Sequence, residues 1–168
     1  MIQYILNPPD VVSVPVALTR SVFPIRRIYC VGRNYLEHIR EMKESDERDP
    51  PFFFQKPRDS IVLNGQVVPY PPETNDFQFE VELVVAVGKS GCQISKEDAL
   101  DHIFGYAVGL DMTRRDRQRE SGKKGLPWEI GKSFDSSAPC GMLHTVAEVG
   151  HISNGQIFVS VNGETKQD

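Results

Sequence analysis

Two glutamates, Glu80 and Glu82, stand two positions apart in the most regular alternation of apolar and polar residues in this 168-residue sequence. The side-chain period of a β-strand places both carboxylates on one face, with about 7 Å between their Cα atoms. A third acid, Asp111, ends another strand-like run. Carboxylates beside buried positions need a neutralising cation, and hard oxygen ligands suit Mg²⁺ or Mn²⁺. The alternative is that Glu80 and Glu82 lie on a solvated face of a sheet, and the spacing alone does not decide between the two.

A histidine and a glutamate, His38 and Glu41, stand three positions apart in a stretch with helical spacing and therefore share a face. A carboxylate beside an imidazole fixes its tautomer and raises its basicity, which makes a general base. The alternative is a surface pair worth a few tenths of a kcal/mol, which the spacing taken alone favours. The other histidines have no carboxylate so placed and are expected to be structural: His102, His144 and His151.

Several basic and amide side chains have the chemistry to contact an anionic substrate. Lys132 lies between Gly131 and Ser133, a turn-like setting that aims its ammonium group either into a pocket or into solvent. Its position alone does not decide between these. The other possible anion contacts are Lys56 and Arg114, together with three candidate substrate-binding residues, Arg33, Arg115 and Gln118.

Short strands are the main elements available to position these side chains. Alternation, and apolar runs that end in glycine or proline, predict strands over 27–32, 52–57, 77–88, 106–113 and 151–161. An Asn-Gly dipeptide between two apolar arms predicts a β-hairpin over 61–68.

Two short helices complete the predicted elements. The first has helical spacing over 34–42, and a serine-to-aspartate capping box opens the second over 95–104. Residues 1–24 contain four prolines and are expected to form an extended lead-in without helix, followed by one domain over 25–168. Many strands with few helices predict an α+β or mainly β fold.

The composition is that of an ordinary globular domain, with 39% hydrophobic residues, 25% charged residues and a net charge of −4. This mildly acidic balance argues against a nucleic acid or an anionic membrane as partner, since either would need a clustered basic face. The sequence has neither a long apolar span nor the features of a signal peptide, so we expect a cytoplasmic protein. The three cysteines, Cys30, Cys92 and Cys140, form no C-x-x-C pair, so neither a disulfide nor a zinc site is expected.

Five blocks follow one another in a fixed order along the chain. They are C-V-G-R-N-Y-x-x-H-x-x-E-M at 30–42, F-x-K-P at 54–57, and the stretches 80–89, 105–116 and 131–135. Together they resemble the fumarylacetoacetate hydrolase family, and the similarity extends from about residue 25 to residue 141 and weakly to 164. The stretches 23–30, 126–132 and 135–141 are most similar to the branch that hydrolyses fumarylpyruvate in gentisate breakdown.

This resemblance implies a role for each candidate residue and a mixed β-sandwich roll of the C-terminal domain type, usually a homodimer. It also implies that segment 37–50 is a lid over bound ligand. The matched positions are Glu80, Glu82 and Asp111 as ligands of Mg²⁺ or Mn²⁺, His38 and Glu41 as the catalytic dyad, Lys132 at the oxo-acid end of the substrate, and Gln118 as a polar substrate contact.

Members of the family continue beyond the point where this sequence ends, with a Gly-Thr-Pro-x-Gly loop that helps to hold the substrate. The resemblance therefore implies a domain that is incomplete at its C-terminal end. The part expected to be missing would supply sheet strands and a substrate-binding threonine.

The activity that the resemblance implies is metal-dependent hydrolysis of a carbon–carbon bond in an acylpyruvate such as fumarylpyruvate, which gives pyruvate and a carboxylic acid. Its substrate would be a small 2-oxo acid from aromatic catabolism. Three alternatives on the same scaffold stay open: an oxaloacetate decarboxylase, a 2-oxo-alkenoate hydratase or isomerase, and an inactive truncated fragment.

Overall fold

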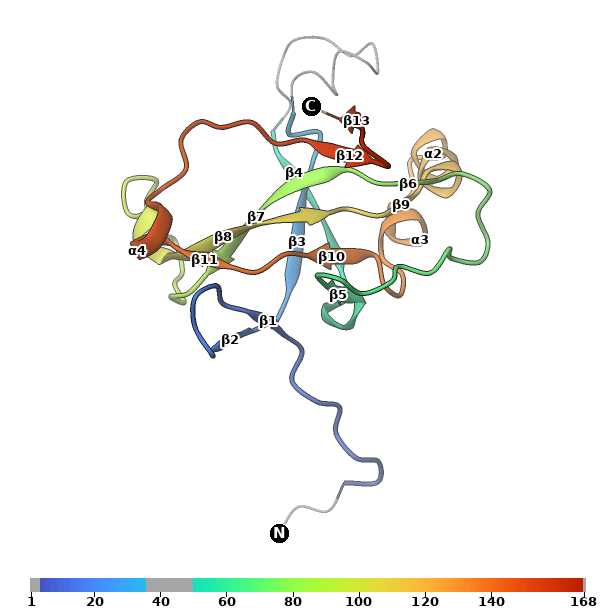
Figure 1. Ribbon diagram of the computed structural model, residues 1–168. Coiled ribbons are helices and arrows are strands. Elements are labelled where there is room, and N and C mark those ends of the chain that lie inside the picture. The colour runs from blue at the N-terminus through green and yellow to red at the C-terminus, as the bar shows by residue number, and fades with distance from the viewer. Residues whose placement is uncertain (1–3, 36–49, 168) are drawn as a thin grey trace.

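The computed structural model describes residues 4–35 and 50–167, and this part of the chain is mainly β with few helices (Figure 1). In chain order, with 3₁₀-helices marked η, the elements are β1 (Ser13–Pro15), β2 (Val22–Pro24), β3 (Ile28–Gly32), β4 (Phe52–Lys56), η1 (Arg58–Ser60), β5 (Ile61–Leu63), β6 (Phe77–Gln78), β7 (Val81–Val87), η2 (Ala99–His102), β8 (Ile103–Leu110), β9 (Thr113–Arg114), α2 (Arg115–Lys123), α3 (Glu129–Lys132), β10 (Ala138–Cys140), β11 (His144–Thr145), α4 (Val146–Val149), β12 (Val159–Val161) and β13 (Glu164–Gln167). The predicted fold class is confirmed.

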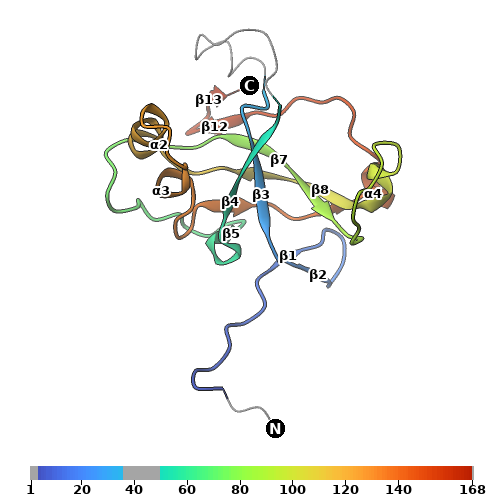
Figure 2. The same cartoon turned by 180° about the vertical axis from the view of Figure 1, so that it is seen from behind.

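The largest sheet has the strand order β11-β8-β10-β5, and β7 also pairs with β8. The β7–β8 ladder is antiparallel and extends from Val81 opposite Leu110 to Val87 opposite Ile103. Helices α2 and α3 lie at one end of this sheet and α4 lies at the other (Figure 1). The antiparallel pair of β3 and β4 crosses the sheet, as the view from behind shows (Figure 2).

The hydrophobic core lies against the face of this sheet that carries Ala86 and Ala107. Alternation along β7 turns Ala86 toward the core, where it meets Ala107 of β8, Cys140 of β10 and Leu143. Val14 of β1 completes the buried cluster and is only 1% exposed. Burying a valine side chain of this kind stabilises the fold by about 1.5–3 kcal/mol.

The expected lead-in over 1–24 contributes to this core. Its described part contains no helix, and β1 and β2 pair in an antiparallel hairpin. The backbone after β1 bonds to a segment far along the chain, because the N–H of Ala17 donates to the oxygen of Leu143 (2.8 Å) and the N–H of Leu143 donates to the oxygen of Pro15 (2.9 Å). The division of the chain at residue 25 stays a prediction.

The strand predicted over 77–88 is present but interrupted. β6 pairs with β9 and β7 pairs with β8, so the two halves have different partners. Glu80 lies at the break, where its backbone oxygen accepts a hydrogen bond from the N–H of Asp111 (2.8 Å). This bond continues the β7–β8 ladder by one residue and brings two of the candidate acids together.

The predicted hairpin over 61–68 is wrong, although its turn is present. Gly65 has a φ of 81° and the N–H of Gln66 donates to the oxygen of Leu63 (3.0 Å). However, β5 pairs in parallel with β10 instead of with the following residues, which form no strand. Pairing with β10 gives β5 a place in the largest sheet, which a local hairpin would not.

The predicted helix over 95–104 is also wrong. The hydroxyl of Ser95 bonds to the carboxylate (2.8 Å) and the backbone N–H (3.1 Å) of Asp98, as in a capping box. These bonds close a turn, the 3₁₀-helix η2 follows, and β8 begins at Ile103 because its backbone pairs with β7. Sheet pairing therefore ends the helical stretch within about one turn.

The remaining expectations are confirmed, confirmed in part or untested. The strands predicted over 27–32 and 52–57 are present as β3 and β4, whereas only the end of the strand predicted over 151–161 forms, as β12. The helix predicted over 34–42 and the lid predicted over 37–50 fall almost wholly outside the described residues. The cysteines are free, as predicted, and no helix in the described ranges is long and apolar enough to span a membrane.

Candidate active site

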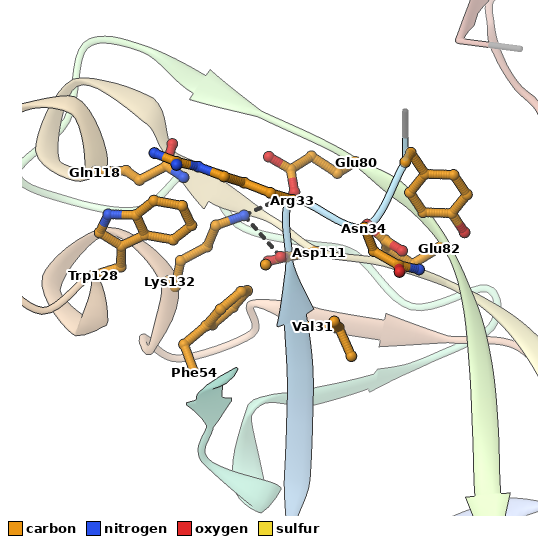
Figure 3. A pocket seen from close by; sticks show the side chains of 12 residues that line it. Val31, Arg33, Asn34, Phe54, Glu80, Glu82, Asp111, Gln118, Trp128 and Lys132 are labelled. Carbon is orange, nitrogen blue, oxygen red and sulfur yellow. Dashed lines mark hydrogen bonds and ion pairs between the residues drawn. The ribbon is translucent and has the colours of Figure 1, made fainter. Parts of the chain in front are cut away.

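A pocket opens where the end of β3, the strands β4 and β7, and the helices α2 and α3 meet (Figure 3). Its walls are formed by Val31, Gly32, Arg33, Asn34, Tyr35, Phe54, Glu80, Glu82, Asp111, Gln118, Trp128 and Lys132. Most of the candidate residues predicted from the sequence are thus brought together. His38 and Glu41 lie outside the described residues, and Arg115 does not line the pocket.

The register of β7 and β8 explains why the three candidate acids meet. Glu82 lies opposite Gly109, and the ladder ends where Glu80 bonds to Asp111. Gly109 must be glycine because a Cβ there would lie 2.8 Å from Val84 and 3.0 Å from the backbone oxygen of Pro139. The three carboxylates therefore meet at the end of the β7–β8 pair, and Glu80 and Glu82 line one pocket, as the predicted shared face requires.

The Lys132 ammonium lies among these acids, and its side chain is only 1% exposed. Its Nζ donates to Asp111 Oδ2 (2.7 Å), Glu80 Oε2 (2.8 Å) and Thr113 Oγ1 (2.8 Å), two of which are drawn as dashed lines in Figure 3. These three acceptors satisfy all three of its N–H groups. The sequence left open whether the Lys132 side chain faces a pocket or solvent, and the structure shows that it faces the pocket.

A second buried ammonium, that of Lys56, lies behind the first. Its Nζ is 2.9 Å from Asp111 Oδ1 and donates to the backbone oxygens of Met112 (3.0 Å) and Lys132 (2.5 Å). Burial lowers the pKa of Lys56, while Asp111 opposes that shift. Sequence reasoning treated Lys56 only as a possible anion contact. The available signal was that it shares a strand face with Phe54, which strand alternation turns inward with it.

Arg115 contacts one of the three acids, Glu80. Its guanidinium donates to Glu80 Oε1 (2.5 Å), Gln78 Oε1 (2.9 Å) and Gln118 Oε1 (2.6 Å). Burial disfavours the ionised form of Glu80, but Lys132 and Arg115 outweigh burial and hold the pKa of that carboxyl below its usual value. Arg115 thus supports two residues that line the pocket.

Glu82 differs from its two neighbours. Among the described residues it forms no ion pair with a lysine or arginine. Burial raises its pKa to about 7, and the negative charges of Glu80 and Asp111 add to that effect. The charge of Lys132 and a hydrogen bond with Tyr35 oppose this rise in the pKa of Glu82 without cancelling it. Glu82 is therefore the one of these three acids that no ion pair among the described residues neutralises.

The donor set fits a divalent cation, although its geometry here is set by lysine. Within the described ranges, no three His, Cys, Asp or Glu side chains are arranged to hold a metal, since the Lys132 ammonium lies between Glu80 and Asp111. However, Glu82 forms no ion pair with a described lysine or arginine, and Asp111 Oδ1 is buried with only the Lys56 ammonium beside it, at 2.9 Å. Carboxylate oxygens are hard donors, which are the ligands that Mg²⁺ or Mn²⁺ prefers.

Aromatic side chains form the other wall of the pocket. Trp128 packs edge-to-face on Phe52, with ring centroids 5.1 Å apart, and lies 6.0 Å from Phe54. The Arg33 guanidinium lies over the Trp128 ring at 6.0 Å and over Phe52 at 5.9 Å. Sequence reasoning included Arg33 but missed Trp128 and Phe54. The F-x-K-P block and the only tryptophan of the chain were the signals available.

Comparisons with known proteins show the family of the chain. The family model described as "Fumarylacetoacetate (FAA) hydrolase C-terminal" matches residues 27–168. A crystal structure of fumarylpyruvate hydrolase from Pseudomonas aeruginosa in complex with Mn²⁺ and pyruvate is 48% identical, with a TM-score of 0.93 over 98% of this chain and 72% of that one.

Two further relatives differ in their activities. The mitochondrial oxaloacetate tautomerase of Caenorhabditis elegans is 40% identical over 141 residues, which is 84% of this chain and 65% of that protein. The fumarylpyruvate hydrolase of a Ralstonia species is 42% identical over 116 residues, which is 69% of this chain and 60% of that protein. The chain thus spans less than two thirds of the length of these relatives. The family match includes every residue that lines the pocket, and the chain accordingly belongs to the fumarylacetoacetate hydrolase family.

Proposed function

We propose that this chain carries the active site of a metal-dependent acylpyruvate hydrolase, with fumarylpyruvate as its model substrate and Mg²⁺ or Mn²⁺ as its cofactor. The observation that carries the proposal is the group of Glu80, Glu82 and Asp111 around Lys132 in one pocket. It is supported by 48% identity to a fumarylpyruvate hydrolase crystallised with Mn²⁺ and pyruvate.

The oxo-acid end of the substrate belongs beside these acids. A divalent cation held by Glu80, Glu82 and Asp111 would supply Lewis-acid stabilisation of the negative charge that develops on the leaving pyruvate. Lys132 adds a fixed positive charge at the same end, where it is most useful as that charge forms. Gln118 presents its amide to the pocket, and Arg115 holds the Oε1 atom, which leaves the NH₂ group to donate to a substrate oxygen.

The carbon–carbon bond is broken by water. In this proposal, His38, oriented by Glu41, takes a proton from a water molecule whose oxygen attacks the acyl carbonyl carbon. The bond from that carbon to the pyruvate methylene then breaks, and its electron pair leaves on the pyruvate enolate. The enolate takes up a proton to give pyruvate, and the acyl group leaves as a carboxylic acid. Both dyad residues are assigned here from the sequence alone.

A second candidate function is tautomerisation or decarboxylation of oxaloacetate. The 40% identity to the C. elegans oxaloacetate tautomerase favours it. Both reactions generate an enolate of a 2-oxo acid beside the same cation, but neither needs an activated water.

A homodimer and a cytoplasmic location also stay predictions.

The deciding experiment follows the ultraviolet absorbance of fumarylpyruvate and of oxaloacetate, each mixed with the chain and Mg²⁺ or Mn²⁺. Hydrolase activity predicts loss of fumarylpyruvate with one pyruvate and one fumarate formed per turnover, abolished by EDTA. Glu82→Gln should abolish it, whereas the matched control Glu97→Gln, at an exposed position outside the pocket, should not. Turnover of oxaloacetate alone would support the second function. If neither compound reacts, repeating the assay with a chain of the length of its relatives distinguishes an incomplete site from a different substrate.

A further inference from the structure

The pocket has two chemically different ends, and one short helix joins them. α3 carries Lys132 at its last position, and Trp128 directly precedes its first turn. The backbone oxygen of Trp128 accepts hydrogen bonds from the N–H groups of Gly131 (2.8 Å) and Lys132 (2.9 Å). A single helical turn therefore fixes the distance between the ammonium at the acidic end and the indole at the aromatic end.

The indole is held in place from behind. Phe52 packs against it edge-to-face, and Gly32 lies opposite Phe52 in the β3–β4 pair. A Cβ at position 32 would lie 2.2 Å from Phe52 Cζ, so this ring reaches Trp128 only because residue 32 is glycine. The Arg33 side chain extends over the pocket toward Trp128, and both residues line it (Figure 3). At the aromatic end of the pocket, the Trp128 ring thus packs against Phe52 and lies beneath the Arg33 guanidinium.

We propose that Trp128 is a specificity-determining residue, whose indole is the surface against which the acyl group of the substrate packs. This inference rests on the proposed function, since the oxo-acid end must be held near Lys132 for the acyl group to reach the indole. A planar, conjugated acyl group stacks on an aromatic surface and buries apolar area there, whereas an acetyl group gains little. The indole surface therefore selects planar, unsaturated acyl groups.

The kinetic test compares two acylpyruvates that differ only in the acyl group, fumarylpyruvate and acetylpyruvate. In Trp128→Leu, the ratio of kcat/KM for fumarylpyruvate to that for acetylpyruvate should fall about tenfold. Trp128→Phe should keep the ratio within about threefold of the unmodified chain, because it retains an aromatic face. Phe53→Leu, on the exposed side of β4, is the matched control and should leave the ratio unchanged. Equal losses for both substrates in Trp128→Leu would overturn the proposal, because they would mean that the indole only supports α3.

A binding measurement keeps the test independent of turnover and of variant stability. Trp128 is the only tryptophan of the chain, so its fluorescence reports on this wall alone. Fumarate added to the unmodified chain with Mg²⁺ and pyruvate should change the emission saturably, and acetate should not. A saturable change without hydrolysis of any acylpyruvate would refute the proposed function but support Trp128 as the surface that binds the acyl group. Hydrolysis with no change in emission, and with an unaltered substrate ratio in Trp128→Leu, would refute this role of Trp128 but leave the proposed function in place.

Discussion

The ammonium of Lys132 lies 2.7 Å from Asp111 Oδ2, so one side chain neutralises an acid that the resemblance assigns to a metal. Glu80 shares that ammonium at 2.8 Å. A divalent cation bound by these acids, as proposed above, would therefore compete with Lys132 for the same carboxylates. This competition should be measurable as a change in the Tm of the protein when metal is added.

Lys132→Met should weaken the metal-free protein but strengthen its response to metal. Removing one partner of a buried ion pair costs about 3–5 kcal/mol, because the remaining charge stays buried without compensation. Added Mn²⁺ should then raise the Tm of the variant more than that of the unmodified chain, since the cation would no longer share Glu80 and Asp111 with an ammonium. Thermal unfolding in EDTA and in Mn²⁺ measures both. An identical Mn²⁺-induced shift in the two proteins would show that Lys132 and the cation do not compete.

Glu82 should make the metal-free protein less stable as the pH rises. Its pKa is raised from the ordinary 4.5 to about 7 in the folded chain, so the folded state binds more protons than the unfolded state between those values. The favourable contribution is therefore complete below about pH 4.5 and is lost as the pH rises through 7. Urea unfolding in EDTA across this range should show the decline, and Glu82→Gln should remove that part of it. If Glu82→Gln and the control Glu97→Gln kept the same slope as the unmodified chain, the assignment would be wrong.

The three thiols should react in a fixed order. Burial raises the pKa of Cys30 to about 12, with a further contribution from Asp111, and burial also raises the pKa of Cys140. Cys92 is exposed. Because the thiolate is the reactive form, iodoacetamide at about pH 8 should modify Cys92 first and the other two only after unfolding. Peptide mass spectrometry of timed samples reads out the order, and early modification of Cys30 would contradict it.

Asp116 should stabilise the junction between the loop before β6 and helix α2. Its carboxylate accepts hydrogen bonds from the hydroxyl of Thr74 (2.5 Å) and the N–H of Asn75 (3.0 Å). These bonds lower the pKa of Asp116, so its contribution is present above the ordinary carboxyl range and is lost as the pH falls below it. Asp116→Asn should cost about 1 kcal/mol in the free energy of unfolding at neutral pH. Asp59→Asn, at an exposed position in η1, is the control, and equal losses in both variants would contradict this role.

The sequence was informative where one local rule governs a segment. Strand alternation correctly turned Glu80 and Glu82 to one face, and the apolar runs located β3 and β4. It was uninformative about helix α2, which has no apolar stripe and buries only Arg115 and Ser121. Its helical conformation depends on tertiary contacts, which hydrophobic periodicity does not reveal.

The contacts that complete the site were also beyond local reasoning. Lys56 reaches Asp111 and Lys132 across long stretches of chain, and a single sequence gives no register between β4 and α3. The hairpin over 61–68 failed for the same reason, since β5 has its partner in β10. Pairing between distant segments decided these cases, and a single sequence without relatives does not record it.

The hydrogen bonds that join the N-terminal hairpin to Leu143 have a consequence for the order of folding during synthesis. Val14 enters the core only when Leu143 and the strand β10 are available to cover it. Contacts between such distant residues form slowly, because a long loop must close first. During synthesis, β1 therefore stays without its core partners, with Val14 exposed, until Leu143 has left the ribosome. A chaperone that binds short apolar segments would find a target in the segment around β1.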